Sequence, residues 1–191
     1  MKTKNIFILG PPASGKTTFV SFLSKSASRA NKSLLFVNDG EIYRLICPKK
    51  SDHKKNYYYQ GDKLIFLPQA RDGILRDGLK KMAQLGLEAQ GNYRYCLLEF
   101  TYPDWAEAIK NYFQKLLSLD TVLVFFDYDE KLAFLRNRKR KASLQIPKSY
   151  LLMFRDDKTT KLFSLFKKVI RINNQGSLSE LEKKAREFFS C

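Results

Sequence analysis

The strongest constraint on the fold is the segment at residues 10–17, which reads Gly-Pro-Pro-Ala-Ser-Gly-Lys-Thr. It follows directly on an apolar run at residues 6–9, and it opens a stretch at residues 16–29 whose apolar residues recur at helical spacing. The pattern G-x-x-x-x-G-K-[ST] between a strand and a helix is typical of a loop that surrounds phosphate groups. We therefore expect a strand, a phosphate-binding loop and a helix at the start of the chain.

The residue types in this loop suit a nucleoside triphosphate with magnesium. Gly10 and Gly15 allow backbone conformations that aim amide hydrogens at phosphate oxygens, and the N-terminus of the following helix adds positive potential. Lys16 is expected to reach the β- and γ-phosphates, and the Thr17 hydroxyl is expected to ligate magnesium. We predict ATP and Mg²⁺ as cofactors, with the nucleotide bound by Gly10, Pro11, Pro12, Ala13, Ser14, Gly15, Lys16, Thr17 and Thr18.

Five short apolar runs predict the strands of one sheet. They are nearly continuous rather than alternating, which is typical of strands buried on both faces of a parallel sheet. Segments with helical patterns lie between them, including residues 104–117, and residues 179–189 are expected to form a closing helix. Alternating strands and helices predict an open α/β sheet with right-handed crossovers, in a single domain over residues 1–191. The runs are residues 6–9, 34–37, 95–100, 122–126 and 169–172.

Two segments do not fit this alternation. Residues 48–69 are polar and rich in tyrosine, and residues 136–148 form a dense basic patch that ends at a proline. Insertions over the carboxyl edge of an α/β sheet often cover the substrate or form a lid. We therefore expect a substrate insertion at about residues 48–69 and a short lid at about residues 136–148. An ordinary surface loop is the alternative for residues 48–69.

The net charge of +16 indicates a molecule that attracts anions. Nucleotides, other phosphorylated substrates and nucleic acid all fit, and a solvated lysine-rich surface is the alternative. Three widely spaced cysteines without a CxxC pair argue against a disulfide framework or zinc site. The apolar run near the N-terminus is shorter than the roughly 7–15 residues of a secretory signal, and no run approaches the ~20 residues of a membrane span. We expect a soluble, cytoplasmic protein.

The segment at residues 10–18, GPPASGKTT, resembles the Walker A loop of P-loop kinases and is most similar to that of the adenylate-kinase-like nucleoside and nucleotide kinases. The resemblance implies a three-layer P-loop fold with a five-stranded parallel sheet in the order 2-3-1-4-5. It also implies a kinase reaction. The chain contains no N/T-K-x-D tetrapeptide, which a Ras-type GTPase would carry, and no LSGGQ-like signature of a transporter ATPase.

The resemblance also implies an acceptor site after the second expected strand, at residues 38–44. In similar kinases an acidic residue there orients or deprotonates the acceptor hydroxyl, and an arginine shortly after it binds the acceptor. Asp39 is our first candidate for the acid and Glu41 the second, with Arg44 as the arginine. Asp39 before a helix also fits a helix N-cap, and the two roles do not exclude one another.

The third expected strand ends in an acid, Glu99. This resembles the Walker B position, whose carboxylate lies beside the phosphate loop and holds the magnesium shell. Thr17 and Glu99 are therefore the expected metal residues. Glu99 should lie nearer the metal than Asp39, because the third strand neighbours the first in the expected order. In deoxynucleoside kinases an acid at this place is the acceptor-site base, so both roles stay open for Glu99.

The basic segment after Asp129 and Glu130 resembles the lid of the same kinases, in which arginines close on the transferring phosphates. Arg136 and Arg140 are the expected catalytic arginines, and they would share one helix face if the helix continues. A solvated basic helix end is the alternative. Residues 173–177, after the fifth expected strand, resemble the loop whose backbone contacts adenine, and Asn173 is the nucleotide-binding residue expected there.

Together these features predict an ATP-dependent phosphotransferase acting on a nucleoside or nucleotide. The basic segment leaves a nucleic-acid 5′-end kinase as one alternative, and the loop alone leaves a nucleotide-gated switch with slow hydrolysis as another. The expected partner is a small phosphorylated or hydroxyl-bearing substrate, with nucleic acid as the alternative and no membrane. The expected catalytic residues are Lys16, Asp39, Glu99, Arg136 and Arg140.

Overall fold

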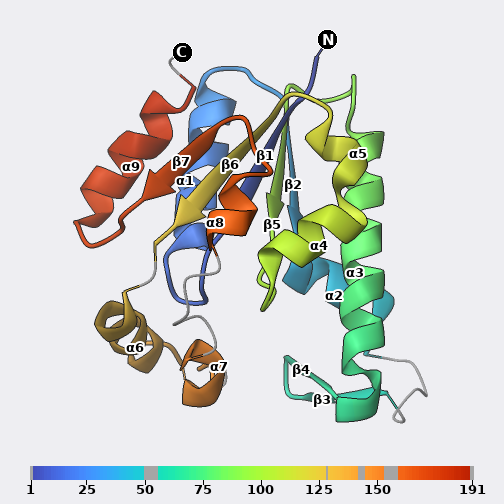
Figure 1. Ribbon diagram of the computed structural model, residues 1–191. Helices are drawn as coiled ribbons and strands as arrows, with labels where there is room; N and C mark the ends of the chain where they lie inside the picture. The colour runs from blue at the N-terminus through green and yellow to red at the C-terminus, as the bar shows by residue number, and fades with distance from the viewer. Residues whose placement is uncertain (1, 50–55, 128, 142–144, 153–158, 190–191) are drawn as a thin grey trace.

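The computed structural model describes residues 2–49, 56–127, 129–141, 145–152 and 159–189. At its centre is a five-stranded parallel sheet in the order β2-β5-β1-β6-β7 (Figure 1). Numbered along the chain within this sheet, the order is 2-3-1-4-5, so the predicted α/β fold and strand order are confirmed. The strands are β1 (Lys4–Leu9), β2 (Leu34–Asn38), β5 (Tyr95–Glu99), β6 (Thr121–Phe126) and β7 (Val169–Ile172).

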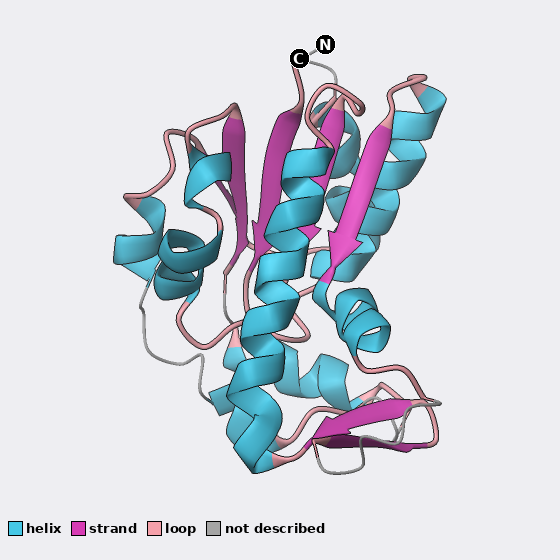
Figure 2. Cartoon of the chain, turned by 90° about the vertical axis from the view of Figure 1, so that its right-hand side faces the viewer, coloured by secondary structure: helices cyan, strands magenta, loops and turns pink. Residues whose placement is uncertain are grey.

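Helices cover both faces of the sheet (Figures 1 and 2). Phe7 and Leu9 of the central strand belong to one core cluster, and Ile6 and Ile8 belong to another on the opposite face. All four are fully buried, which explains why this strand is a continuous apolar run. One face is covered by α1 (Lys16–Arg29) and α9 (Leu178–Glu187), and the other by α3 (Pro68–Glu88), α4 (Trp105–Tyr112), α5 (Gln114–Leu117) and α8 (Thr159–Phe163).

The helix expected at residues 104–117 is two helices, so this prediction is wrong in its extent. Asp104 caps α4, because its side chain accepts a hydrogen bond from Glu107 N at 3.0 Å. Phe113 then leaves the helical conformation, with φ −113° and ψ 12°, before α5 begins. Its fully buried ring stacks on Phe100 at 5.2 Å and meets Phe7 edge-on. The break therefore coincides with an aromatic contact between distant segments, which helical spacing does not encode.

The longest described helix, α3, lies in a part of the chain for which the sequence predicted no helix. Its sequence includes glycines, each of which lowers helix propensity by about 1 kcal/mol relative to alanine. Two of these glycines permit close packing. A Cβ at Gly78 would collide with the Tyr43 ring, and a Cβ at Gly86 would lie 2.7 Å from Leu116 Cδ1. Gly78 and Gly86 thus weaken the helical pattern in the sequence, and the same two residues allow α3 to pack closely against Tyr43 and Leu116.

Residues 57–66 form an antiparallel hairpin, with β3 (Tyr57–Gln60) and β4 (Lys63–Phe66). The hairpin docks on the end of α2 (Asp39–Ile46). Tyr59 Oη donates a hydrogen bond to Cys47 O at 2.8 Å, and the Phe66 ring meets the Tyr43 ring edge-on at 5.4 Å. Figure 2 shows it as a small separate sheet beyond the end of the main sheet. Residues 57–66 are therefore regular structure, while their role as a substrate insertion stays a prediction.

Helix α6 (Glu130–Arg138) contains the first residues of the basic segment, and α6 and α7 (Lys148–Leu152) lie beyond the same end of the main sheet as α2 and the hairpin (Figure 1). Because α6 ends at Arg138, Arg136 and Arg140 do not share a helix face, which the sequence made conditional on the helix continuing. The buried Asn137 side chain holds the segment that follows: it donates a hydrogen bond to Ile146 O at 2.8 Å and accepts one from Ile146 N at 2.9 Å. None of the described helices is long and apolar enough to cross a membrane.

Candidate active site

The loop between β1 and α1 has a backbone that depends on its glycines. Gly10 has φ 144° and Gly15 has φ 102°, values that side chains disfavour. A Cβ at Gly10 would also lie 2.7 Å from Phe126 O, and a Cβ at Gly15 would collide with Asn174 Nδ2. Ala13 is left-handed as well, with φ 62°. The loop therefore has the curvature that a cradle for phosphate needs.

The N-terminus of α1 opens onto this loop. Its N-cap, Gly15, contributes no side-chain hydrogen bond, and the first helical turn contains no acidic residue. The amide hydrogens of the first turn, which includes Thr17 and Thr18, therefore have no side-chain cap, and no acidic residue of the helix itself offsets their positive potential. A helix end of this kind is suited to bind an anion.

Lys16 is buried, and its ammonium lies over the loop. Nζ donates hydrogen bonds to Gly10 O at 2.7 Å and to Pro11 O at 2.8 Å. Burial lowers the pKa of Lys16 to about 8, while the carboxylates of Glu99 and Asp39 oppose this shift. At pH 7 the ammonium is still mostly protonated, so a cation lies within the loop.

Thr17 and Glu99 are in direct contact, since Thr17 Oγ1 donates a hydrogen bond to Glu99 Oε1 at 2.8 Å. The parallel register explains the contact, because Glu99 pairs with Ile8 of β1 and with Asn38 of β2. Glu99 is buried, and its Oε2 has no hydrogen-bond partner among the described residues. A buried carboxylate oxygen beside a hydroxyl suits a hard cation such as magnesium, which usually takes one or two carboxylates together with substrate phosphates.

Asp39 is the first residue of α2 and does not cap it. The N-cap is Asn38, whose Oδ1 accepts a hydrogen bond from Gly40 N at 2.9 Å, so the predicted capping role of Asp39 is wrong. Asp39 Oδ2 instead accepts a hydrogen bond from Thr101 N at 2.9 Å. Burial, with a smaller contribution from the Glu99 carboxylate, raises the pKa of Asp39 to about 6 despite this hydrogen bond. Asp39 is therefore an acid that titrates close to neutral pH.

Arg136 and Arg140 line one cavity of about 430 Å³, although they do not share a helix. Arg136 Nη1 donates a hydrogen bond to Ser14 O at 3.2 Å, and Nη2 donates one to Asn174 O at 2.6 Å. Burial lowers the pKa of Arg136 from its ordinary value, and the guanidinium stays charged at neutral pH. We call this space the phosphate cavity, and its lining residues are Pro12, Ala13, Gly15, Lys16, Thr17, Thr18, Glu99, Thr101, Arg136, Arg140, Ile146, Asn174, Leu178 and Leu181.

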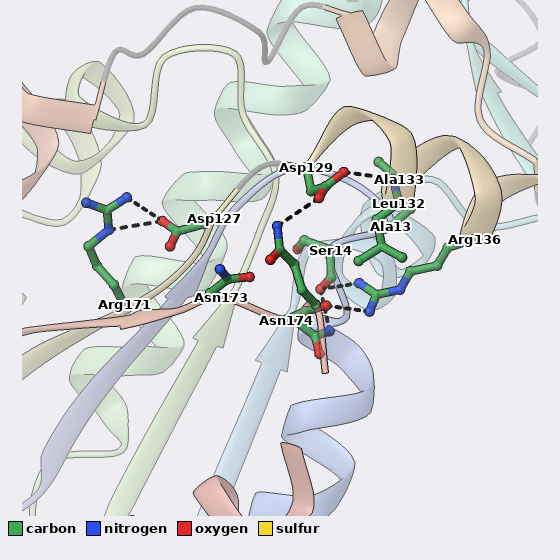
Figure 3. A pocket seen from close by; sticks show the side chains of 11 residues that line it. Ala13, Ser14, Asp127, Asp129, Leu132, Ala133, Arg136, Arg171, Asn173 and Asn174 are labelled. Carbon is green, nitrogen blue, oxygen red and sulfur yellow. Dashed lines mark hydrogen bonds and ion pairs between the residues drawn. The ribbon is translucent and has the colours of Figure 1, made fainter. Parts of the chain in front are cut away.

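A second cavity, of about 170 Å³, lies where β6 and β7 end, and we call it the base cavity (Figure 3). Gln175 Nε2 donates a hydrogen bond to Asp129 Oδ2 at 2.9 Å, and Asp127 forms an ion pair with Arg171 at 2.7 Å. Its wall thus combines carboxylates with amide side chains. The lining residues are Ala13, Ser14, Asp127, Asp129, Leu132, Ala133, Arg136, Arg171, Asn173, Asn174 and Gln175.

Asn173, the residue expected here, lines the base cavity, but Asn174 makes the contact with the loop: its Nδ2 donates a hydrogen bond to Ser14 O at 2.8 Å. The sequence singled out Asn173 rather than Asn174 within the expected loop, and it missed Asp127. Asp127 directly follows a buried strand, which is close to the signal that singled out Glu99. For Asn174, no signal in the sequence distinguishes it from its neighbour.

A third cavity, of about 330 Å³, lies between α2, the hairpin and residues 145–147, and we call it the acceptor cavity. Arg44, a predicted substrate residue, lines it. Neither candidate acid lines any of these three cavities: Glu41 is exposed, and Asp39 lies beside Gly40 of this cavity and accepts its hydrogen bond from Thr101 of the phosphate cavity. The lining residues are Gly40, Tyr43, Arg44, Asp62, Lys63, Leu64, Phe66, Gln145, Ile146 and Pro147.

No sequence profile of a known family matches the chain, and no curated protein is similar to it at a significant level. Solved structures are similar in fold. A shikimate kinase from Acinetobacter baumannii, solved in complex with shikimate, has 18% identity and a TM-score of 0.59, over 98% of this chain and 93% of that chain. A deoxyadenosine kinase from M. mycoides, solved with its products, has 10% identity and a TM-score of 0.59, over 97% of this chain and 98% of that chain.

A sugar kinase from Janibacter sp. HTCC2649 has 13% identity and a TM-score of 0.56, over 98% of this chain and 95% of that chain. At such identities the likeness concerns the fold, and it spans nearly the whole length of all three proteins. Together with the loop, the strand order and the contact between Thr17 and Glu99, it leads to one conclusion. The chain has the fold of the P-loop kinases.

Proposed function

We propose that the chain is an ATP-dependent phosphotransferase that moves the γ-phosphoryl group to a hydroxyl of a small acceptor, a nucleoside or nucleotide. The observation that carries this proposal is the contact between Thr17 and Glu99 in a cavity that Lys16, Arg136 and Arg140 also line. Phosphoryl transfer needs positioned phosphates, a divalent cation and further cations that stabilise negative charge in the transition state. The phosphate cavity offers a residue for each of these needs.

The nucleotide is proposed to place its phosphates in the phosphate cavity and its base in the base cavity. Backbone amides at the N-terminus of α1 and the Lys16 ammonium would bind the phosphates. Asp127 and Asp129 offer carboxylates that accept hydrogen bonds from an exocyclic amino group, and Asn173 offers an amide that both donates and accepts. Adenine presents an amino group next to ring nitrogen acceptors, so this wall supports ATP.

Thr17 and Glu99 would hold magnesium, Thr17 through its hydroxyl and Glu99 through its carboxylate. When bound, the ion supplies charge neutralisation between the β- and γ-phosphates. Arg136 and Arg140 would add positive charge from the lid side. Guanidinium suits this task because it stays charged and binds phosphate oxygens in pairs.

Asp39 is proposed to accept the proton of the acceptor hydroxyl. Its pKa of about 6 leaves it mostly ionised at pH 7, and a base performs best when its pKa lies near the working pH. Glu99 would then serve the metal, since its carboxylate contacts Thr17 and lines the phosphate cavity. Of the two roles that the sequence left open for Glu99, this arrangement supports the metal role.

The proposal is tested by incubating the protein with γ-labelled ATP, magnesium and a panel of nucleosides, nucleotides, sugars and oligonucleotides. We expect labelling of a small acceptor by the wild type and none by Lys16→Ala. The control is Lys25→Ala, an exposed position on the same helix, which should label the acceptor normally. Release of inorganic phosphate without any labelled acceptor would support a nucleotide-gated switch instead. Labelling of an oligonucleotide 5′ end, with binding that falls steeply as salt is added, would support a nucleic-acid end kinase.

A further inference from the structure

We infer that Asn174 is a positioning residue of the phosphate loop: its amide group holds the Ser14 carbonyl so that the Gly15 amide hydrogen is aimed into the phosphate cavity. Arg136 shares this task by donating to the same carbonyl. The inference rests on the proposed function, in which the loop between β1 and α1 binds the phosphates of ATP. It gives Asn174 a role toward the phosphates, although the residue belongs to the segment expected to contact the base.

Two side chains from distant parts of the chain donate hydrogen bonds to the Ser14 carbonyl oxygen. Asn174 Nδ2 donates at 2.8 Å, and Arg136 Nη1 donates at 3.2 Å. A second nitrogen of Arg136, Nη2, donates to Asn174 O at 2.6 Å, so the three residues form a closed set of hydrogen bonds (Figure 3). The carbonyl is thus fixed from outside the loop, by α6 and by the segment that follows β7.

The carbonyl of Ser14 and the amide of Gly15 belong to one peptide group. A trans peptide directs its C=O and N–H bonds to opposite sides, and all peptide bonds of the described residues are trans. Ser14 lines the base cavity, whereas Gly15 lines the phosphate cavity. Holding the oxygen on the base side therefore turns the Gly15 amide hydrogen toward the proposed place of the phosphates.

The Gly15 amide has no hydrogen-bond partner within the described part of the protein. The hydrogen bonds of α1 begin with Phe19 N, which donates to Gly15 O at 3.0 Å. The Ser14 carbonyl, which lies just before this first helical acceptor, is taken by the two side chains instead. An amide that lies at a helix N-terminus without a protein partner is suited to donate to a phosphate oxygen.

The conformation of this peptide needs support from its surroundings. Gly15 has φ 102°, and glycine loses more conformational freedom than other residues when it is held in one conformation. A Cβ at Gly15 would collide with Asn174 Nδ2, so the Asn174 amide lies directly against the loop backbone. A loop that is held in advance loses less entropy when the ligand binds. The phosphate chain should therefore bind even without a base.

A direct contact with the base is the alternative role for Asn174, because this residue lines the base cavity as well as the phosphate cavity. Inorganic tripolyphosphate separates the two roles. It has a chain of three phosphates, as ATP has, but neither ribose nor base. Loss of the Asn174 amide should weaken tripolyphosphate binding if the residue positions the loop, and should leave that binding unchanged if the residue contacts only the base.

The test measures the Kd of tripolyphosphate and of ATP, both with magnesium, for the wild type, Asn174→Ala and Asn174→Leu. The leucine variant keeps most of the side-chain volume but has no donor. We expect the wild type to bind tripolyphosphate with a Kd of about 1 mM or lower, and both variants to raise both Kd values by a similar factor of about 10. The matched control is Asn173→Ala, which changes the neighbouring wall of the base cavity and should leave the Kd of tripolyphosphate unchanged.

Several results would overturn the inference. They are a wild type that does not bind tripolyphosphate at millimolar concentration, a leucine variant that binds it normally, and an Asn173→Ala variant that loses as much affinity as Asn174→Ala. Weaker binding of ATP alone would assign Asn174 to the base. If the tripolyphosphate Kd rises as expected but the wild type phosphorylates no acceptor, the proposed function fails and the positioning role stands. Phosphorylation of an acceptor together with an unchanged tripolyphosphate Kd in both variants would have the opposite meaning.

Discussion

Thr17 Oγ1 and Glu99 Oε1 lie 2.8 Å apart although 82 residues separate them, so the first helix and the third strand of the main sheet along the chain meet at the proposed metal site. Glu99→Gln keeps an oxygen that can accept the Thr17 hydrogen bond but removes the negative charge. We expect kcat to fall about 10–100-fold with every acceptor, and the magnesium concentration for half-maximal activity to rise. Steady-state rates over a magnesium titration measure both effects. The exposed Glu88→Gln is the control, and an unchanged magnesium requirement in Glu99→Gln would contradict the assignment.

Asp39 should give the reaction an acidic limb in its pH profile. Because its pKa is raised to about 6, the base is lost by protonation below that pH, and kcat should fall about 10-fold per pH unit there. Asp39→Asn should lower kcat by about 100-fold or more, abolish the limb and leave the Kd for ATP unchanged. Rates from pH 5 to 8 for the wild type, Asp39→Asn and the exposed control Asp72→Asn test this. A limb that persists in Asp39→Asn would assign the titration to another group.

The same raised pKa predicts how stability depends on pH. The unfolded carboxyl titrates near 4, so the folded state binds the proton more tightly, and stability falls as the pH rises from about 4 to 6. Above that range the loss is complete. The amide introduced by Asp39→Asn would still accept the hydrogen bond from Thr101 N without carrying charge. We therefore expect the variant to match the wild type in Tm at pH 4 and to exceed it at pH 7. Thermal unfolding of both proteins at pH 4 and at pH 7 checks this. The same difference in Tm between variant and wild type at the two pH values would exclude a raised pKa of Asp39 as its cause.

The lid arginines should affect the rate more than ATP binding, because their contacts with the transferring phosphate strengthen in the transition state. Arg136→Ala and Arg140→Ala are each expected to lower kcat at least about 10-fold. Arg136→Ala should also weaken ATP binding more than Arg140→Ala does, since it loses the hydrogen bonds to Ser14 O and Asn174 O. Paired measurements of kcat and ATP Kd test this order. Arg138→Ala, exposed on the last turn of α6, serves as the control. Normal kcat in both lid variants would place the patch on the solvated surface.

The sheet was predictable from the sequence because burial on both faces leaves a local trace. Each strand is a short apolar run, and Glu99 stands out because an acid directly ends such a run. The phosphate loop was predictable for a related reason, since its backbone shape requires glycine at fixed places such as Gly10. Features that depend on neighbouring residues alone are visible in a single chain.

The features that were missed depend on contacts between distant segments. Asn38 rather than Asp39 caps α2, because the Asp39 carboxylate accepts a hydrogen bond from Thr101 N, which lies far away in the chain. The choice of Asn174 over Asn173 depends on Ser14, 160 residues away in the chain. Local patterns contain no information about these partners. The sequence therefore identified the two segments, at the start of α2 and after β7, but not which residue in each makes the contact.

The register that pairs Glu99 with both Ile8 and Asn38 fixes the proposed catalytic residues to the main sheet. Residues 17, 39 and 99 are attached to adjoining strands or to the helices that start from them, so a change there would have to move the sheet. The hairpin and residues 145–147 are joined to that frame mainly through side-chain contacts such as those of Tyr59 and Asn137. In the proposed function, an exchange of residues 57–66 would therefore change the proposed acceptor site and leave the residues proposed for phosphoryl transfer in place.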